Sequence, residues 1–282
     1  MKRVLIIGAQ GMLGHDLHKV FTEGDDVIGL DIENVDITRQ GATRKTIKDI
    51  SPAVVINAAG FTDVDGCEKK INKAFAVNGT GSRNVAKACR DNGAKLIYIS
   101  TDYIFDGEKG NPYREDDFPN PLNIYGESKL TGERYIEELL DDYLIVRTQW
   151  LYGQYGRNFV ETILALAAER DSIEVVQDQV GSPTYTADLS KAIAALVAKD
   201  LRGTFHVSNS GYCSWYDFAL EILRIAGITG VEVVPVSTAA LNRPAKRPLY
   251  SIFDHQRLQQ EGIEMRPWQE ALQNYFRCRG GA

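Results

Sequence analysis

Tyr125 and Lys129 stand four residues apart in the segment Asn123-Ile-Tyr-Gly-Glu-Ser-Lys129. On a helix this spacing places two side chains on the same face. A nearby ammonium group can lower the pKa of a tyrosine hydroxyl from about 10. A tyrosine tuned in this way can give or take a proton near neutral pH. The pair therefore indicates proton transfer, although a simple surface pair on a helix has the same spacing.

Two further segments precede this pair in the chain. Ser100-Thr101-Asp102-Tyr103 follows an apolar run, and the glycine-rich turn Gly8-Ala-Gln-Gly11-Met-Leu-Gly14 lies near the amino terminus. The order and spacing of the three pieces indicate a nicotinamide-dependent enzyme that moves a hydride and a proton at a C–O centre.

The glycine turn falls between an expected strand, 3–7, and an expected helix, about 12–23. This is the context of a dinucleotide-binding turn, in which glycines let the backbone approach a pyrophosphate. The helix amino terminus adds free N–H groups and a positive dipole end. A glycine-rich turn without a ligand is the competing interpretation.

Further cofactor contacts are expected where the next strands end. Asp31 ends the second strand, where a carboxylate can accept from a ribose hydroxyl and would repel a 2′-phosphate, which favours NADH over NADPH. Asp36 and Ile37 are placed at the adenine edge. Asn57-Ala-Ala-Gly60 ends the third strand with small residues that a cofactor can cross. An ordinary surface aspartate and a tight turn are the alternatives.

Short apolar runs alternate with helical segments through the first half of the chain. Strands are expected at 3–7, 26–30, 53–57, 95–99 and 143–147, and helices at about 12–23, 43–50, 71–92 and 125–140. This alternation predicts an α/β fold with a Rossmann-like, doubly wound parallel sheet. Residues 107–121, rich in Gly, Pro and Asp, are expected to form an exposed loop.

The pattern is less regular after residue 150. Helices are expected at 159–169, 188–198 and 214–226, with strands at 174–176, 204–207 and 231–235. We therefore predict a dinucleotide-binding domain over residues 1–150 and a smaller α/β substrate-binding lid over 151–282. Some elements of the second half are expected to return to the first domain.

Bulk composition narrows the function classes. The 282 residues carry a net charge of −6, which argues against non-specific nucleic-acid binding. The longest apolar runs fall short of the roughly 20 residues that span a bilayer. The four cysteines lack metal-ligand spacing, which favours free thiols in a reducing cytoplasm.

The chain resembles the extended short-chain dehydrogenase/reductase superfamily through the glycine turn, Asn57-Ala-Ala59, Val77-Asn78, Ser100-Thr101 and Tyr125-x-x-x-Lys129. More narrowly it is similar to the dTDP-4-dehydrorhamnose reductases. That similarity rests on five segments in family order: 100–105, 121–126, 147–150, 178–184 and Arg247-Pro248 followed by Ser251. It implies reduction of the C4 ketone of dTDP-4-dehydro-L-rhamnose to dTDP-L-rhamnose, the last step of dTDP-rhamnose biosynthesis, which supplies cell-wall polysaccharide.

The resemblance also implies residue roles. Tyr125 is expected to donate the proton to the C4 oxygen, Lys129 to hold the nicotinamide ribose, and Thr101 to hydrogen-bond the carbonyl oxygen. The expected substrate-binding residues are Thr101, Asp102, Tyr103, Trp150 and Arg247. The 180–184 turn and the loop from Arg243 to Arg247 are expected to hold the thymidine diphosphate.

Together these arguments give one predicted site for NADPH or NADH. The expected cofactor-binding residues are Gly8, Gln10, Gly11, Met12, Leu13, Asp31, Asp36, Ile37, Ala58, Ala59, Gly60, Thr62, Tyr125 and Lys129. Members of the family often use both cofactors, so the preference stays open.

Some relatives dimerise through magnesium held by glutamates near the termini. Here Asp16 and Ala187 stand at two such positions, and the tail 277–282 has no carboxylate side chain. We therefore expect no metal site, and a monomer or a homodimer that is not metal-bridged.

Two other functions remain open. A nucleotide-sugar 4-epimerase or 4,6-dehydratase shares the superfamily, but a dehydratase typically has Asp-Glu after the catalytic threonine, where this chain has Asp102-Tyr103. A non-catalytic regulatory subunit, like that of methionine adenosyltransferase, would keep the fold and bind cofactor without turnover. The exact nucleotide and sugar, and the glycan that receives the rhamnose, are also undetermined.

Overall fold

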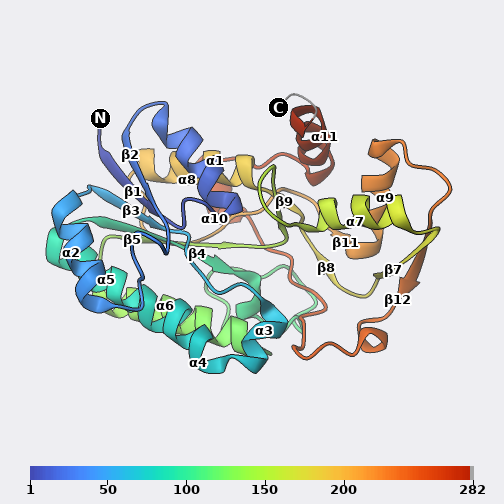
Figure 1. Ribbon diagram of the computed structural model, residues 1–282, viewed down its shortest axis with the longest axis horizontal. Coiled ribbons are helices and arrows are strands. Elements are labelled where there is room, and N and C mark those ends of the chain that lie inside the picture. Colours follow the sequence, from blue (N-terminus) through green and yellow to red (C-terminus); the bar gives the residue numbers. More distant parts are fainter. Residues whose placement is uncertain (280–282) are drawn as a thin grey trace.

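A six-stranded parallel sheet forms the centre of the molecule, seen in a computed structural model that describes residues 1–279 (Figure 1). The strand order is β10-β5-β4-β3-β1-β2. The strands are β1 (Arg3–Ile7), β2 (Asp26–Leu30), β3 (Val54–Asn57), β4 (Lys95–Thr101), β5 (Tyr143–Thr148) and β10 (Gly203–His206). Their central members are apolar runs buried on both faces, as a parallel sheet covered by helices requires. The predicted α/β class with a parallel sheet is confirmed.

Helices cover both faces of this sheet (Figure 1). One face carries α1 (Met12–Thr22) and α8 (Thr186–Ala198), and the other carries α2 (Gln40–Ile50), α5 (Ser82–Asn92) and α6 (Ile124–Leu139). Alternate residues of β1 divide between the two cores: Val4 and Ile6 pack with α1 and α8, whereas Leu5 packs with α2, α5 and α6. Because all neighbouring strands of this sheet pair in parallel, their carboxyl ends lie at one edge.

The chain reverses its direction of winding at β1. From β1 it moves to β2 on one side, and it then crosses to β3 on the other side. Loops on either side of such a reversal separate, which leaves a crevice at the carboxyl ends of the strands. The glycine turn after β1 and the small residues after β3 both lie at this crevice.

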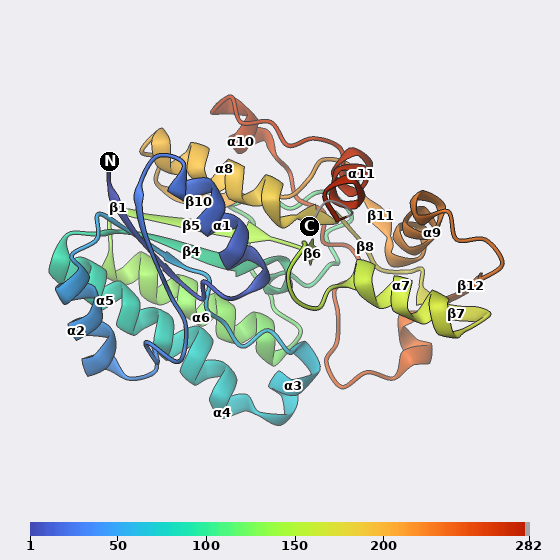
Figure 2. The same cartoon turned by 45° about the horizontal axis from the view of Figure 1, so that its top comes forward.

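The second half of the chain is shared between the sheet and a smaller layer. Strand β10 pairs with β5, and α8 packs on α1. The smaller layer has a parallel pair, β7 (Ser172–Val176) and β12 (Glu232–Val236), with α7 (Phe159–Glu169) and α9 (Trp215–Ala226) beside it (Figure 2). Helix α11 (Trp268–Arg279) packs against α9. Two elements that follow residue 150, α8 and β10, thus belong to the sheet domain rather than to the smaller layer.

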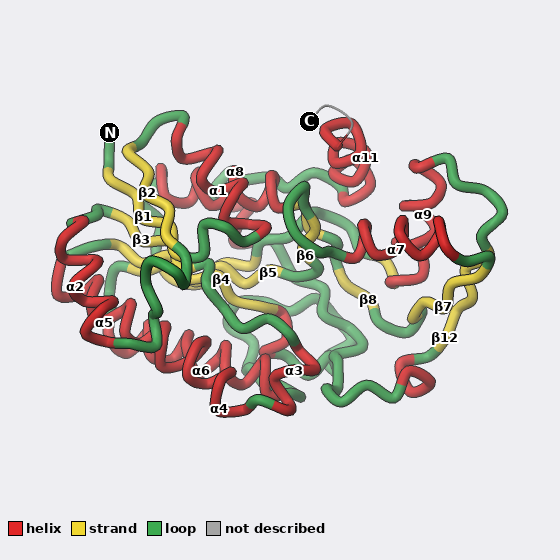
Figure 3. Tube along the Cα trace, in the orientation of Figure 1, coloured by secondary structure: helices red, strands yellow, loops and turns green. Residues whose placement is uncertain are grey.

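Several short elements were not expected from sequence. They are α3 (Val64–Lys69), α10 (Gln256–Gln260), the 3-10 segments Asp102–Ile104 and Thr238–Leu241, and the two-residue pairs β6 (Leu151–Tyr152) with β9 (Thr184–Tyr185) and β8 (Val180–Gly181) with β11 (Cys213–Ser214). The long helix α11 was missed as well. Figure 3 shows how small the extra strands are beside the central sheet. Pieces this short have too few residues for a recognisable period.

The expected helix over residues 71–92 contains an internal change of winding. It begins as α4 (Ile71–Ala74), continues as a π-helical segment from Phe75 to Gly81, and ends as α5. Within the π segment, Asn78 is buried and bonds both backbone groups of Phe61 as well as the Ser128 hydroxyl. A π segment often marks a functional region, and here it ties the loop after β3 to helix α6.

A buried ion pair joins α6 to the end of β5. Arg147 donates to Glu133 at 2.8 Å and 3.2 Å, and both residues are almost fully buried. We expect Glu133→Gln to destabilise the fold by about 3 kcal/mol, because it leaves the arginine charge buried without its partner. Urea denaturation gives this difference directly.

The matched control is Asp49→Asn, which breaks the exposed pair of Lys45 and Asp49. An exposed pair on a helix contributes less than about 0.5 kcal/mol. Equal losses in the two variants would contradict the assignment of Arg147 and Glu133 as a stability determinant.

None of the helices in residues 1–279 is long and apolar enough to cross a membrane.

Candidate active site

The glycine turn brings three pieces of backbone into close contact. Gly8 has φ +87°, and a Cβ there would lie 2.8 Å from the Ala59 nitrogen. A Cβ on Gly14 would collide with the Gly8 carbonyl oxygen. Gly11 is the N-cap of α1 and has no side chain to cap it. The first N–H groups of the helix therefore remain for another acceptor, such as a phosphate.

Asp31 closes this turn from the neighbouring strand. Its carboxylate accepts from the backbone N–H of Gln10 at 3.1 Å and of Ile32 at 2.8 Å. The carboxylate is thus fixed at the end of β2 and retains lone pairs for a ribose hydroxyl. Farther along, Asp36 accepts from the N–H and hydroxyl of Thr38, and these bonds lower the pKa of Asp36.

The predicted site residues other than Arg247 line two adjoining hollows of about 420 and 540 Å³, which share Gly8, Gly11, Ala58, Ala59 and Gly60. The first hollow is also lined by Gln10, Asp31, Asp36 and Ile37. The second is also lined by Met12, Leu13, Thr62, Thr101, Asp102, Tyr103, Tyr125, Lys129 and Trp150. Together they form one cleft along the carboxyl edge of the sheet, with a volume in the range of ligand-binding sites.

Tyr125 and Thr101 meet inside the second hollow. Tyr125 lies in the first turn of α6, whose N-cap Asn123 accepts from the Gly126 N–H at 2.9 Å. Burial raises the pKa of Tyr125, and a hydrogen bond with the Thr101 hydroxyl opposes this rise. The expected lowering by Lys129 is wrong for the protein alone, because desolvation of the phenol dominates. Tyr125 therefore keeps its proton at neutral pH.

Lys129 lies one turn farther along α6 and is buried. Its ammonium donates to the Ile99 carbonyl oxygen at 2.5 Å and lies 4.0 Å from the centre of the Tyr98 ring. Burial lowers the pKa of Lys129 to about 7, although Glu133 raises it. The side chain can therefore change its charge near neutral pH.

Asp102 is held in a buried polar network that the sequence did not indicate. Thr101 donates to Asp102 at 3.1 Å, and burial raises the pKa of Asp102 to about 6 while bonds with Ser251 and Thr101 lower it. Gln149 accepts from the Ser182 N–H at 2.9 Å and donates to the Ser251 carbonyl oxygen at 3.0 Å. Gln149 also lines the cleft. The sequence feature that could have indicated Gln149 as a cleft residue is its position next to Trp150 in the segment Arg147-Thr-Gln-Trp150.

Arg247 differs from its expected state as a free phosphate ligand. Its guanidinium donates to both carboxylate oxygens of Asp65 in α3, at 2.9 and 3.1 Å. Arg243 also lies 3.7 Å from Asp65. Arg247 is not among the residues that line the cleft. A ligand phosphate would have to share this arginine with Asp65, a pairing between distant segments that sequence could not reveal.

Trp150 lines the cleft at the end of β5, and its backbone has φ +49°. A bulky residue in this region is strained by about 1–3 kcal/mol, and the surrounding structure must hold it there. Trp215, which sequence analysis did not single out, lines the same cleft.

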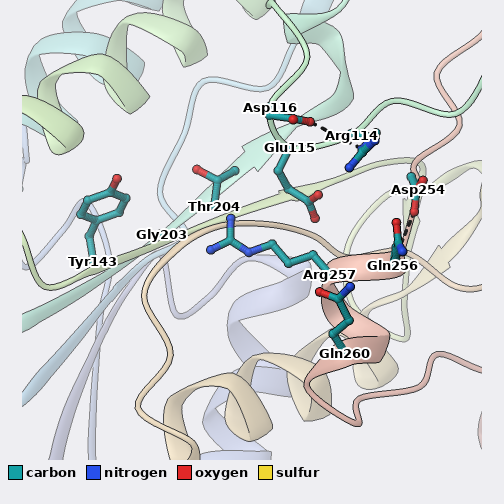
Figure 4. Close-up of a pocket in the computed structure, with 10 residues that line it drawn as sticks. All are labelled: Arg114, Glu115, Asp116, Tyr143, Gly203, Thr204, Asp254, Gln256, Arg257 and Gln260. Atoms are coloured by element: carbon teal, nitrogen blue, oxygen red, sulfur yellow. Dashed lines mark hydrogen bonds and ion pairs between the residues drawn. The ribbon is translucent and has the colours of Figure 1, made fainter.

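A separate cavity of about 510 Å³ lies over the edge strand β10 (Figure 4). None of the predicted site residues lines it. Its charged groups already have partners: Glu115 accepts from the His206 N–H at 3.0 Å, and Arg114 pairs with Asp116 at 3.6 Å. We assign the chemistry to the cleft instead.

Within residues 1–279, no group of three or more His, Cys, Asp or Glu side chains is placed to hold a metal ion. Residues 280–282 of the tail considered above lie outside the described residues.

The fold and the cleft define the class of protein. A doubly wound sheet, a glycine turn at the helix amino terminus, and a Tyr-x-x-x-Lys helix beside a threonine form the arrangement of a nicotinamide-dependent oxidoreductase.

Comparison with known proteins narrows this class. Residues 1–278 match the family model described as the RmlD substrate binding domain, and the chain belongs to this family. It is 44% identical to the dTDP-4-dehydrorhamnose reductase of Streptomyces griseus, over 97% of this chain and 93% of the relative. It is 42% identical to the spore coat polysaccharide biosynthesis protein SpsK of Bacillus subtilis, over 100% and 99%.

A solved structure shows the same fold with a cofactor. The dTDP-4-dehydrorhamnose reductase of Bacillus anthracis in complex with NADP is 46% identical and superposes with a TM-score of 0.95 over 98% of each chain. The expected family and an NAD(P)H-dependent oxidoreductase are therefore confirmed.

Proposed function

We propose that this protein uses NADPH or NADH to reduce the C4 ketone of dTDP-4-dehydro-L-rhamnose to dTDP-L-rhamnose. The observation that carries the proposal is the meeting of Thr101, Tyr125 and Lys129 in one cleft with the glycine turn. The named reductases among the relatives support the choice of a dTDP-linked 4-ketosugar.

The cleft fits a dinucleotide by its backbone geometry. The space beside Gly8 and Gly14 is so narrow that any side chain there would meet backbone atoms. We assign the pyrophosphate to the N–H groups of Met12 and Leu13, because the Gly11 N–H already donates to the Gly8 carbonyl oxygen, and we assign the adenosine ribose to Asp31. A bound cofactor supplies the hydride.

The protein's own groups handle the proton. Tyr125 donates its phenolic proton to the C4 oxygen. The Thr101 hydroxyl, which donates to Asp102 in the free protein, turns to donate a hydrogen bond to the same oxygen as negative charge develops there. Lys129 in its ammonium form then stabilises the tyrosinate that remains. Trp150 excludes water from the sugar side.

Lys129 gives a prediction about proton uptake. At pH 8 its amine is mostly neutral in the free protein, because its pKa is about 7. The phosphates and ribose hydroxyls of a cofactor favour the ammonium form and raise this pKa. We expect NADPH binding to take up a proton at pH 8 and to take up progressively less below pH 7, where the lysine is already charged.

Titration calorimetry in two buffers of different ionisation enthalpy measures this uptake. Lys129→Met should abolish the buffer dependence at pH 8. Identical binding enthalpies for the wild-type protein in both buffers would contradict the assigned role of the lysine charge.

The reaction itself is tested by NADH and NADPH oxidation with dTDP-4-dehydro-L-rhamnose, generated in place from dTDP-glucose by the two preceding enzymes. Oxidation that depends on the sugar nucleotide supports the proposal, and the two rates establish the cofactor preference. Purified protein that retains tight NAD would favour an epimerase or dehydratase instead. Cofactor binding without oxidation, together with co-purification of a partner enzyme, would favour a regulatory subunit.

A further inference from the structure

Trp150 is unlike the other residues with a left-handed backbone in the described chain. Of the four non-glycine residues with positive φ, Ser51, Asp200 and Asn242 are small polar residues of the kind found in turns. Trp150 is the one bulky member, and its carbonyl oxygen accepts from the Thr184 N–H at 3.1 Å. An indole in this conformation must be held by its neighbours.

Two neighbours form the slot that holds the indole. The Trp215 ring stacks on Trp150 with centroids 3.6 Å apart and planes 9° apart. On Gly181 a Cβ would lie 2.6 Å from Trp150 Cε2, so only glycine leaves room for the ring. The stack and the glycine together allow the indole little freedom.

Trp215 is in turn anchored in the smaller layer. It is the first residue of α9, and Ser214 before it and Asp217 within the first turn form a capping box that fixes this helix end. Phe159 of α7 lies with its ring centroid 4.5 Å from that of Trp215. The position of α9 is thus transmitted to the wall of the cleft.

We propose that Trp215 is a positioning residue that sets the sugar-binding wall of the cleft by holding Trp150 in its strained conformation. This inference rests on the proposed function. A sugar ring cannot enter between indoles 3.6 Å apart, so the substrate contacts only the parts of the pair that line the cleft. These parts form an apolar wall, which suits the C–H face and methyl group of a 6-deoxysugar.

The test compares Trp215→Leu with Trp215→Phe in steady-state kinetics. Leucine keeps apolar bulk but removes the stack, so we expect KM for the sugar nucleotide to rise about tenfold, kcat to change less, and the NADPH dissociation constant to stay the same. Phenylalanine keeps a stacking ring and should remain within about threefold of wild type. Tyr216→Leu, on the same helix but outside the cleft, is the matched control and should leave KM unchanged.

A double-mutant cycle separates positioning from general support of the fold. If Trp215 acts mainly through Trp150, adding Trp215→Leu to Trp150→Leu should raise KM by much less than Trp215→Leu raises it in the otherwise wild-type protein. Additive effects, or an unchanged KM in Trp215→Leu, would overturn the inference while leaving the reductase intact. A wild-type protein without sugar-dependent oxidation would instead overturn the proposed function.

Discussion

Replacing Tyr125 with phenylalanine should lower kcat about 1,000-fold, within the range of about 10² to 10⁴ attributed to general acid catalysis. The substitution removes one hydroxyl from the cleft and keeps the ring that contacts Tyr103 edge-on. Burial keeps the phenol protonated, so the reacting ketone loses its proton donor. Cofactor affinity should stay within about twofold, because the proposed contacts of the dinucleotide lie mostly elsewhere.

The measurement is turnover at saturating cofactor, together with a fluorescence titration of NADPH binding. Tyr135→Phe is the matched control, since Tyr135 lies on the same helix, has the Arg83 guanidinium over its ring and does not line the cleft. Near-wild-type turnover in Tyr125→Phe would show that another group donates the proton.

Replacing Lys129 with methionine should harm both catalysis and cofactor binding. Methionine fills much of the buried volume but lacks the ammonium that donates to Ile99 and faces Tyr98. We expect kcat to fall about 1,000-fold, because the developing tyrosinate loses its nearest positive charge. The NADPH dissociation constant should rise about tenfold with the loss of a charged hydrogen bond.

Lys95→Met provides a control of equal burial. Lys95 is also buried, but it lies at the start of β4, at the end of the strand opposite to Thr101 and the cleft. There it forms ion pairs with Asp142 and Asp200. This variant should lose stability while its kcat and cofactor affinity stay close to wild type. If Lys129→Met lowers kcat but binds NADPH normally, then the lysine acts on the proton alone and does not hold the ribose.

Local sequence predicted most of the sheet and its helices. The buried strands are continuous apolar runs, and the helices are long enough to show a repeating apolar face. β1, β2 and α7 have the expected boundaries, and the other strands of the sheet differ by one or two residues. Short pieces such as α3 were missed, because six residues with an internal glycine have no recognisable face. The π segment was missed because the apolar pattern of a helix does not show where its backbone hydrogen bonds change from i→i+4 to i→i+5.

The cleft residues could be listed in advance because parallel strands end at one edge. Motifs that follow β1, β3 and β4 must then converge, whatever the intervening lengths. The state of those residues was a different matter. Whether the pKa of Tyr125 is raised or lowered depends on how completely its neighbours exclude water from the phenol. Whether Arg247 is free to bind a phosphate depends on Asp65, 182 residues away in the chain.

The sequence by itself determined the fold class, the family and the set of groups that meet at the sheet edge, because these follow from periodicity, motif spacing and strand direction. Only the tertiary structure decided that Lys129 titrates near pH 7, that Asp65 pairs with Arg247, and that Trp215 stacks on Trp150. Burial, pairing and stacking arise between segments that are distant in the chain. Local sequence carries no record of such contacts.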